Sequence, residues 1–104
     1  MAALPDVYHA LGNPIRLEII DRLSRTPEMT TLELLSELGS SRQAATKHLV
    51  VLERAGVVRS KAKGSKVMRR LEPSALAEAR TWLAKRSELW SEKLEALAAY
   101  VEEG

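Results

Sequence analysis

The stretch from Ser40 to Val58, SSRQAATKHLVVLERAGVV, carries the clearest local structural signals in the chain. A helix has about 3.6 residues per turn, so Ala45, Leu49 and Leu52 fall on one side of a helix formed here. The other side carries a mostly polar set: Gln43, Thr46, Lys47, Val50 and Arg54. The stretch therefore predicts an amphipathic helix with one packed face and one presented face.

Both ends of this helix are marked by residues with suitable backbone chemistry. Ser40 followed by Gln43 fits a capping box, in which two side chains satisfy donors that the first helical turn leaves unpaired. Ala55-Gly56 predicts the end, because glycine readily adopts the left-handed conformation found just past a helix terminus. Val57-Val58 then begins a β run. We expect the helix over about 41–55.

Three shorter helices are predicted upstream of this stretch. The first covers 5–11. The second begins at Asn13-Pro14, because asparagine caps a helix and proline is tolerated in its first turn, and Thr26-Pro27 marks its exit. The third opens with a capping box formed by Thr30 and Glu33, and Gly39 ends it. Their apolar residues are Val7, Tyr8 and Leu11 in the first, Ile15, Ile19, Ile20 and Leu23 in the second, and Leu34, Leu35 and Leu38 in the third.

The segment that follows the amphipathic helix, 57–71, predicts a basic β-hairpin. Basic and small or apolar residues alternate on both sides of a Lys63-Gly64-Ser65 turn. Two short helices joined by Gly39-Ser40 and followed by such a hairpin indicate a winged helix-turn-helix. An alternative is a plain surface hairpin whose lysines block sheet edges.

Charge is concentrated in the middle of the chain. Between Ser40 and Leu71 nine basic residues face Glu53 alone, a net charge of +8, so the other residues sum to −6 in a chain of net charge +2. Such a basic surface with acidic flanks is typical of nucleic-acid binding, and a solvated charged face is the alternative.

The C-terminal part, 74–103, predicts one long helix, because it lacks internal glycine and proline and is rich in Ala, Leu, Glu and Lys. Its apolar stripe is too wide for a small domain to bury, so we expect a second subunit to cover it. The predicted dimer interface is Trp82, Leu83, Leu89, Trp90, Leu94, Leu97 and Val101. The alternative is that this helix folds back on its own domain.

The overall composition narrows the class of protein. We expect 104 residues to form a single domain, 1–104, that is mainly α with a small β-hairpin. The chain has no cysteine, which excludes disulfides, thiolate metal sites and thiol redox switching. It has no charged-then-apolar leader and no apolar run near the roughly 20 residues of a membrane span, so we expect a cytoplasmic protein. It shows no cysteine nucleophile, no glycine-rich phosphate loop and no histidine beside a serine and a carboxylate in a recognisable motif, so we expect neither an enzyme nor a cofactor.

Two segments carry a family resemblance. Leu11-Gly12-Asn13-Pro14-Ile15-Arg16-Leu17-Glu18-Ile19-Ile20 is similar to the opening "L-x-x-P-x-R-x-x-I" stretch of the ArsR/SmtB family. Thr46-Lys47-His48-Leu49-x-x-Leu52-x-x-Ala55-Gly56-Val57-Val58 resembles the recognition-helix signature of that family. The resemblance is to its metal-free members with a Trp-rich C-terminal helix, and it implies a homodimeric winged helix-turn-helix repressor that binds DNA.

The metal sites of that family are not matched. The cysteine pair of metal-sensing relatives aligns with Thr30 and Leu32, which do not bind soft metals. The other family site uses histidine on the C-terminal helices, and no histidine follows His48. We therefore expect no metal site, and His9 and His48 alone do not supply a closed ligand set.

We expect the helix over 41–55 to enter the major groove of an operator in double-stranded DNA, with Gln43, Thr46 and Lys47 toward base edges. Ser40, Ser41 and Arg42 would lie near phosphates, as would the wing. His48 is expected to be half-buried and hydrogen-bonded, and it is a weaker phosphate candidate. The remaining predicted contacts are Arg54, Arg59, Lys61, Lys63, Lys66, Arg69 and Arg70.

Two points about partners stay open in the sequence. The alternative function is a protein-protein interaction module that docks through the long helix. An unidentified small-molecule effector would bind at the apolar seam around Trp82 and Trp90, where no residue specifies its chemistry.

Overall fold

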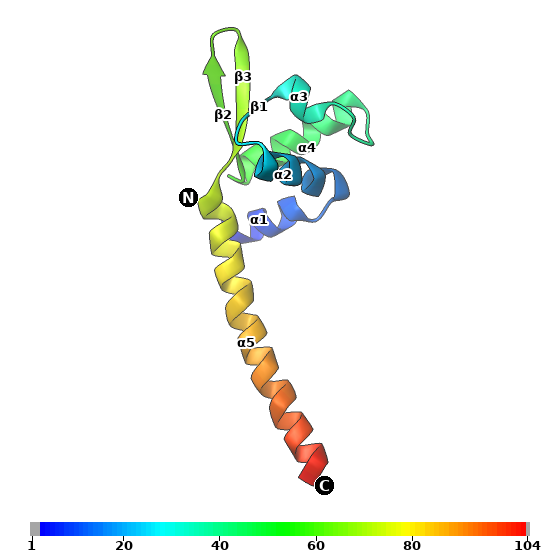
Figure 1. Ribbon diagram of the computed structural model, residues 1–104, viewed down its shortest axis with the longest axis vertical. Coiled ribbons are helices and arrows are strands. Elements are labelled where there is room, and N and C mark those ends of the chain that lie inside the picture. The colour runs from blue at the N-terminus through cyan, green and yellow to red at the C-terminus, as the bar shows by residue number, and fades with distance from the viewer. Residues whose placement is uncertain (1–2, 104) are drawn as a thin grey trace.

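The computed structural model describes residues 3–103. Its elements are α1 (Leu4–Leu11), α2 (Pro14–Arg25), β1 (Met29–Thr30), α3 (Thr31–Leu35), α4 (Arg42–Arg54), β2 (Val58–Lys63), β3 (Lys66–Leu71) and α5 (Pro73–Glu103). Figure 1 shows two parts: the first four helices and the sheet gather together, and α5 extends away from them. The predicted architecture, a winged helix-turn-helix with a long C-terminal helix, is confirmed. We call residues 3–81 the head.

The core of the head lies between α1, α2, α4 and the base of the wing. Ile19, Leu34, Leu49, Leu52 and Val57 are among its fully buried side chains. Ala75 and Ala79, in the first turns of α5, are also buried in this core. The packed face predicted for α4 is confirmed, since Ala45, Leu49 and Leu52 are its buried residues.

The predicted starts of α2 and α3 are confirmed in atomic detail. Asn13 Oδ1 accepts hydrogen bonds from the backbone N–H of Ile15 at 2.8 Å and of Arg16 at 3.2 Å. The Thr30 hydroxyl oxygen accepts from the Glu33 N–H at 3.2 Å, and the Glu33 carboxylate accepts from the Thr30 N–H at 3.0 Å. The Thr30 hydroxyl also donates to the Glu33 carboxylate at 2.7 Å, and this hydrogen bond, followed by the one from the Thr30 N–H, lowers the pKa of Glu33.

Helix α3 is shorter than the sequence predicted. It ends at Leu35, before Leu38 and Gly39. The Arg22 guanidinium of α2 donates to the carbonyl oxygens of Leu34, at 3.2 Å, and of Ser36, which would otherwise accept within a longer helix. Glu37 then adopts a left-handed conformation with φ of 59°. The chain turns there, and Leu38 still packs into the core.

The capping box predicted at Ser40 is wrong by one residue. Ser41 is the N-cap of α4, and its hydroxyl oxygen accepts from the Ala44 N–H at 3.2 Å. The other end of α4 is as predicted, because the helix stops at Arg54 and Gly56 has a φ of 78°.

The wing belongs to a three-stranded antiparallel sheet in the order β1-β3-β2. Strand β1, which the sequence pattern did not predict, pairs through Met29 with Arg69 and through Thr30 with Met68. Directly paired residues lie on the same face of a sheet and alternate faces along each strand. The register therefore places Ser60 and Arg69 on one face, which we call the inner face. The opposite, outer face carries five cations: Arg59, Lys61, Lys63, Lys66 and Arg70.

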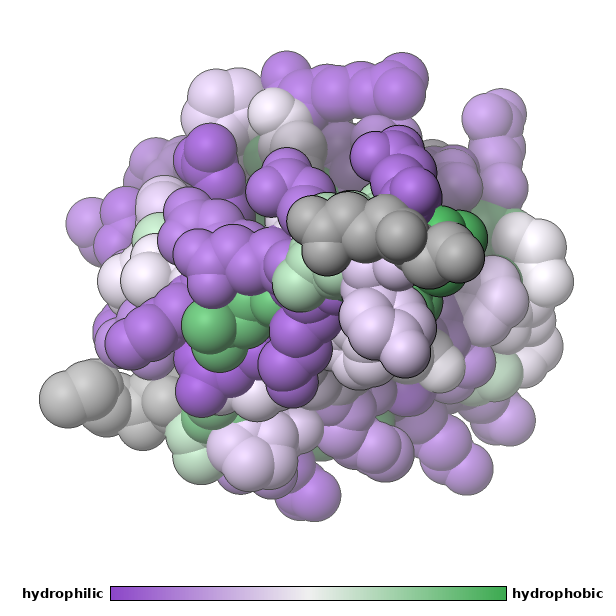
Figure 2. Space-filling view, turned by 90° about the horizontal axis from the view of Figure 1, so that it is seen from below, coloured by the Kyte–Doolittle hydropathy of each residue, from purple (hydrophilic) through white to green (hydrophobic). Residues whose placement is uncertain are grey.

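Helix α5 gives the molecule its elongated shape. It is 31 residues long, and the longest dimension of the described chain is 69 Å. The radius of gyration is 18.4 Å, against about 13 Å for a compact chain of this length. From Trp82 onward, its large apolar side chains are exposed, so the alternative that the helix folds back on its own domain is wrong. Figure 2 shows hydrophobic side chains at the surface between charged ones.

Candidate nucleic-acid interface

The presented face of α4 is polar and accessible near the N-terminal end of the helix. Gln43, Thr46 and Lys47 are exposed there, and with Arg42 they line a shallow hollow of about 470 Å³. The Thr46 hydroxyl donates to the Arg42 carbonyl oxygen at 2.8 Å, so part of its hydrogen-bonding capacity is used inside the helix. Within residues 3–103, the exposed side chains of Gln43 and Lys47 form no hydrogen bond or ion pair, so their polar ends can contact a ligand outside the chain.

The start of α4 combines a helix N-terminus with a cation. Ser41 caps the helix through its hydroxyl, Ser40 is half-buried beside it, and Arg42 is exposed in the first turn. Unpaired N–H groups and the helix dipole give this end partial positive charge, which attracts phosphate. The structure thus places all three predicted phosphate contacts at one end of the presented face.

His48 is held by a buried arginine to which the sequence pattern gave no role. The predicted half-burial of His48 is confirmed, and its Nδ1 lies 3.0 Å from Arg16 Nη1. A guanidinium group has donors only, so Nδ1 is the acceptor and the imidazole carries its proton on Nε2. Arg16, 9% exposed, also donates to the carbonyl oxygens of Ala10 at 2.8 Å and His9 at 3.2 Å. One side chain thereby links the end of α1 to α4.

The cations of the outer wing face differ in how free their charges are. Arg59 pairs with Glu72 at 2.6 Å, and Lys63 pairs with Glu28 at 2.7 Å. The side-chain hydrogen bond from Lys63 lowers the pKa of Glu28, and for Glu72 the pKa is lowered by Ser74 and then Arg59. Within residues 3–103, the remaining outer cations form no ion pair and are exposed: Lys61, Lys66 and Arg70.

Arg69 stands apart from the other wing cations. It lies on the inner face, its side chain is 17% exposed, and it pairs with Glu53 of α4. The structure therefore does not bring Arg69 together with the outer cations that the sequence grouped with it.

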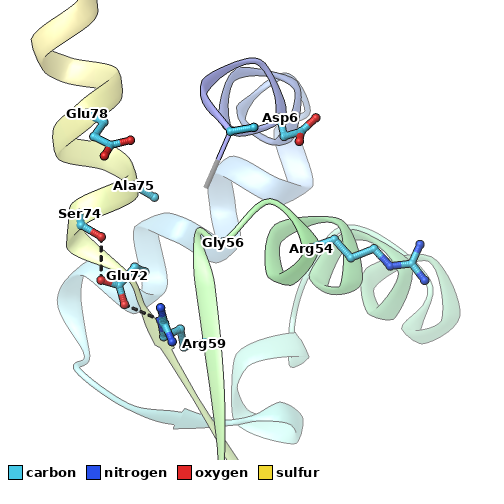
Figure 3. A pocket seen from close by; sticks show the side chains of 9 residues that line it. Asp6, Arg54, Gly56, Arg59, Glu72, Ser74, Ala75 and Glu78 are labelled. Carbon is cyan, nitrogen blue, oxygen red and sulfur yellow. Dashed lines mark hydrogen bonds and ion pairs between the residues drawn. The ribbon is translucent and has the colours of Figure 1, made fainter. Parts of the chain in front are cut away.

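Arg54 and Arg59 line a cleft away from the presented face. This cleft, of about 490 Å³, lies between the starts of α1 and α5, the end of α4 and the base of β2. Figure 3 shows Arg59 directed at Glu72, and Arg54 directed away from both Glu72 and Glu78. Arg54 is eleven positions after Gln43, or about three helical turns, so it lies at the opposite end of α4 from Gln43. Most of the predicted DNA contacts thus fall into three places: the start of α4, the outer wing face and this cleft. Arg69 on the inner face and the half-buried His48 lie outside these three places.

Two kinds of feature are absent from the part of the chain that the structure describes. No three histidine, cysteine, aspartate or glutamate residues in 3–103 are grouped so as to hold a metal ion. In the same range, no helix combines the length and apolar character required to cross a membrane.

The comparisons with known proteins agree with this geometry. A family model described as a helix-turn-helix domain matches residues 11–61. The uncharacterized HTH-type transcriptional regulator YuzN of Bacillus subtilis is 45% identical over 64 residues, which are 56% of this chain and 70% of that protein. The HTH-type transcriptional regulator Rv2034 of Mycobacterium tuberculosis is 32% identical over 99 residues, 94% of this chain and 89% of that protein.

Solved structures show the same likeness over most of the chain. An ArsR-like transcriptional regulator from Rhodococcus sp. RHA1 has a TM-score of 0.75 and 31% identity, covering 90% of this chain and 88% of that one. The homodimeric winged helix-turn-helix DNA-binding domain of Mb0332 from Mycobacterium bovis has a TM-score of 0.60 and 25% identity, with 88% and 81% covered.

The fold, the presented helix and these relatives define a DNA-binding transcriptional regulator of the winged helix-turn-helix class, and not an enzyme. Within that class, the chain belongs to the ArsR family.

Proposed function

We propose that residues 1–104 act as one winged helix-turn-helix unit of a homodimeric repressor, which binds a specific operator in double-stranded DNA. The observation that carries this proposal is the uncovered apolar stripe of α5. Trp90 is 63% exposed and Leu97 58% exposed. Isolated apolar side chains are common on protein surfaces, but a continuous stripe along a projecting helix is typical of a protein interface.

The stripe is organised as two adjoining rows along the helix. At 100° per residue, Trp82, Leu89 and Tyr100 form one row. The other row, within about 60° of arc, is Leu83, Trp90, Leu94, Leu97 and Val101. Arg86 lies over the Trp82 ring at 4.3 Å from its centroid, and Lys93 lies 5.7 Å from that of Trp90. Two such helices related by a two-fold axis bury the same residues from each copy, which satisfies the geometry of a symmetric dimer.

A second copy of this chain is the occupant that we propose for the stripe. The Mycobacterium bovis domain, which shares this fold, is homodimeric. In such a dimer α1 also approaches the interface, because Tyr8 Oη donates to the Ala79 carbonyl oxygen at 2.7 Å and its ring packs edge-on against Trp82. Fully burying an exposed leucine is worth about 1.5–3 kcal/mol. The four leucines of the stripe are 49–59% exposed in each subunit, so their burial in both copies would offset much of the cost of association.

DNA binding follows from the placement of α4 and the wing. We propose that α4 enters the major groove with Gln43 and Lys47 at base edges, while the start of α4 contacts phosphates. Lys61, Lys66 and Arg70 of the outer wing face bind the flanking backbone, because their charges are not balanced by a carboxylate within the described chain. The two copies of α4 would read half-sites about one helical turn apart.

Two finer points belong to this proposal. A transcriptional regulator must share a compartment with the DNA that it binds, and we propose that this one is cytoplasmic. For an effector, we propose the hollow of about 420 Å³ beside Leu4 and Trp82, whose rim carries Lys85 and Arg86.

The test combines subunit association with DNA binding. The double variant Trp90→Glu with Leu97→Glu should sediment as a monomer and lose affinity for a duplex selected from a randomised pool. Because both side chains are exposed, the head should keep its fold by circular dichroism. The control, Ser91→Glu with Ala99→Glu, adds the same charges outside the stripe and should remain dimeric. A double variant that stays dimeric contradicts the interface, and a wild type that selects no duplex contradicts DNA recognition in favour of a protein-docking module.

A further inference from the structure

Glu53 is an unexpected residue in the basic middle of this chain. It is the only acidic residue between Ser40 and Leu71, among nine basic ones. It lies in the last turn of α4 and contacts the wing through Arg69. A carboxylate near phosphates weakens DNA binding by repulsion, so its presence here requires a compensating role.

The structure shows what Glu53 contacts. Its carboxylate pairs with the Arg69 guanidinium, and its Oε1 accepts from the Ser60 hydroxyl at 2.5 Å. Arg69 Nη1 also donates to Ser60 Oγ at 2.6 Å, and Arg69 Nε donates to Thr31 Oγ1 at 3.2 Å. Withdrawal from water lowers the pKa of Arg69. Four side chains from four elements therefore meet in one polar cluster.

The cluster sits where the wing leaves the head. Val57 and Val58 anchor the base of β2 in the core, whereas residues from 59 to 67 are exposed. Figure 1 shows the hairpin of β2 and β3 projecting beyond the helices. Glu53 belongs to α4, Ser60 to β2, Arg69 to β3 and Thr31 to α3. The chain itself joins α4 to the wing through Gly56. The cluster adds a direct polar connection between the recognition helix and both strands of the wing.

We infer that Glu53 and Arg69 form a positioning pair that fixes the angle of the wing relative to α4, so that both elements contact one duplex together. This inference rests on the proposed function, in which α4 and the wing bind the same DNA. Arg69 acts through the other residues of the wing and not as a phosphate contact of its own. The pair is partly buried, with the Arg69 side chain 17% exposed and the Glu53 side chain 31% exposed. A shielded pair of fixed geometry specifies how two elements are arranged more readily than it stabilises the fold, which suits a junction between two binding elements.

Arg69 could be either a phosphate contact or part of a positioning pair, and replacing Glu53 should change the affinity for the duplex in opposite directions in the two cases. If Arg69 were a phosphate contact, Glu53→Gln would remove a repulsive charge and release a cation, so that the duplex would bind more tightly and with a steeper salt dependence. As a positioning pair, the same change should weaken binding about tenfold with the salt slope unchanged, because a charge-assisted hydrogen bond is removed.

The other variants control for charge and for folding. Glu28→Gln removes a carboxylate that pairs with Lys63 on the outer face, so it should bind DNA as tightly as wild type or more tightly. The charge-exchanged variant, Glu53→Arg with Arg69→Glu, keeps a pair in place and should recover most of the affinity that Glu53→Gln forfeits. If Glu53→Gln does not fold, the exchanged variant decides: recovery supports the pair, and failure to recover overturns it.

A distance measurement tests the inference without DNA. The chain has no cysteine, so spin labels at Ser24→Cys in α2 and Ser65→Cys at the wing tip report the wing angle by pulsed electron resonance. Labelled subunits diluted into unlabelled ones exclude distances across a dimer. Wild type should give a narrow distribution and Glu53→Gln a broad one. If wild type and Glu53→Gln give distance distributions of equal width, the inference is wrong even if wild type binds the duplex as proposed. If Glu53→Gln gives the broader distribution but wild type binds no duplex, only the proposed function is contradicted.

Discussion

Arg16→Met is expected to destabilise the head strongly, and the magnitude follows from its three hydrogen bonds. The guanidinium donates to two carbonyl oxygens at the end of α1 and to His48 of α4, at 2.8, 3.2 and 3.0 Å. A buried acceptor left without a partner costs about 1–3 kcal/mol. This cost applies to the Ala10 carbonyl oxygen, because the His9 carbonyl oxygen also accepts from the Gly12 N–H at 3.1 Å. Methionine retains the packing of the arginine stem, and water reaches the half-buried His48. The unpaired Ala10 carbonyl oxygen and the two other lost hydrogen bonds together predict a destabilisation of about 2–4 kcal/mol, a large part of the total stability of a small domain.

The measurement is urea unfolding followed by circular dichroism. Dimerisation would make the midpoint depend on concentration, so the comparison belongs in the monomeric background of Trp90→Glu with Leu97→Glu. Arg25→Met on the same helix is the matched control, because its side chain is 77% exposed and pairs with Asp21 at 3.3 Å. This control should change the unfolding free energy by less than about 0.5 kcal/mol.

Arg16→Lys adds a second check on the mechanism. A lysine keeps the charge but lacks the planar fork that reaches α1 and α4 at the same time, so it should recover less than half of the stability that Arg16→Met removes. A destabilisation below about 1 kcal/mol in Arg16→Met would refute the reasoning, because the unpaired Ala10 carbonyl oxygen alone should cost at least about that much.

Four further outcomes are expected. Gln43→Ala should lower affinity for the selected duplex by about 1–3 kcal/mol and leave random duplex unchanged, as titrations of both will show; an equal decrease on both contradicts base reading. Lys66→Ala should weaken binding to both duplexes and flatten the log–log salt slope by about 0.9 for each phosphate that is no longer neutralised, and an unchanged slope contradicts a role of Lys66 at phosphates. Glu37→Gly should raise the free energy of unfolding by about 1 kcal/mol, measured in urea, since φ is positive there; no gain would show that the turn is unstrained. The pKa of Glu33 is lowered from 4.5 by the Thr30 hydrogen bonds, so its stabilisation is present above pH 4.5 and is lost as pH falls through the folded pKa; thermal melts of Glu33→Gln should depend less on acid pH than those of wild type.

The features that the sequence predicted well depend on neighbours within one helical turn. The Asn13 cap, the Thr30 and Glu33 box and the stop at Gly56 each involve residues at most a few positions apart. Such patterns act through the local backbone, so they can be read without the fold. The amphipathic pattern of α4 worked for the same reason, because a helix converts spacing directly into faces.

The features that it missed depend on distant partners. Helix α3 ends early because Arg22 of another helix takes its carbonyl oxygens. Strand β1 exists only because β3 pairs with it about forty positions later. The error at Ser40 has a different cause, since two adjacent serines are equally suited to cap a helix and only the backbone path selects one.

At the proposed interface, the sequence pattern did not show which charged side chains face outward and which are turned toward other parts of the fold. Charge alone grouped Arg69 with the DNA contacts, yet the strand register turns it inward toward Glu53. Arg16 matched a family motif without revealing that it is buried against α1 and His48. The one usable signal was Glu53 itself, a single acid in a basic segment. The start of α4 and the outer wing cations stay predictions about DNA contact.

The separation between a folded head and a projecting α5 has a consequence for dosage. The head contains its own core, so we expect it to fold without a partner and the subunits of the proposed repressor to exchange between single and paired forms. The paired form then rises with the square of subunit concentration when pairs are scarce. Operator occupancy would respond steeply to the amount of protein synthesised, and a modest fall in supply, or dilution by cell growth, would release the promoter without any signal molecule.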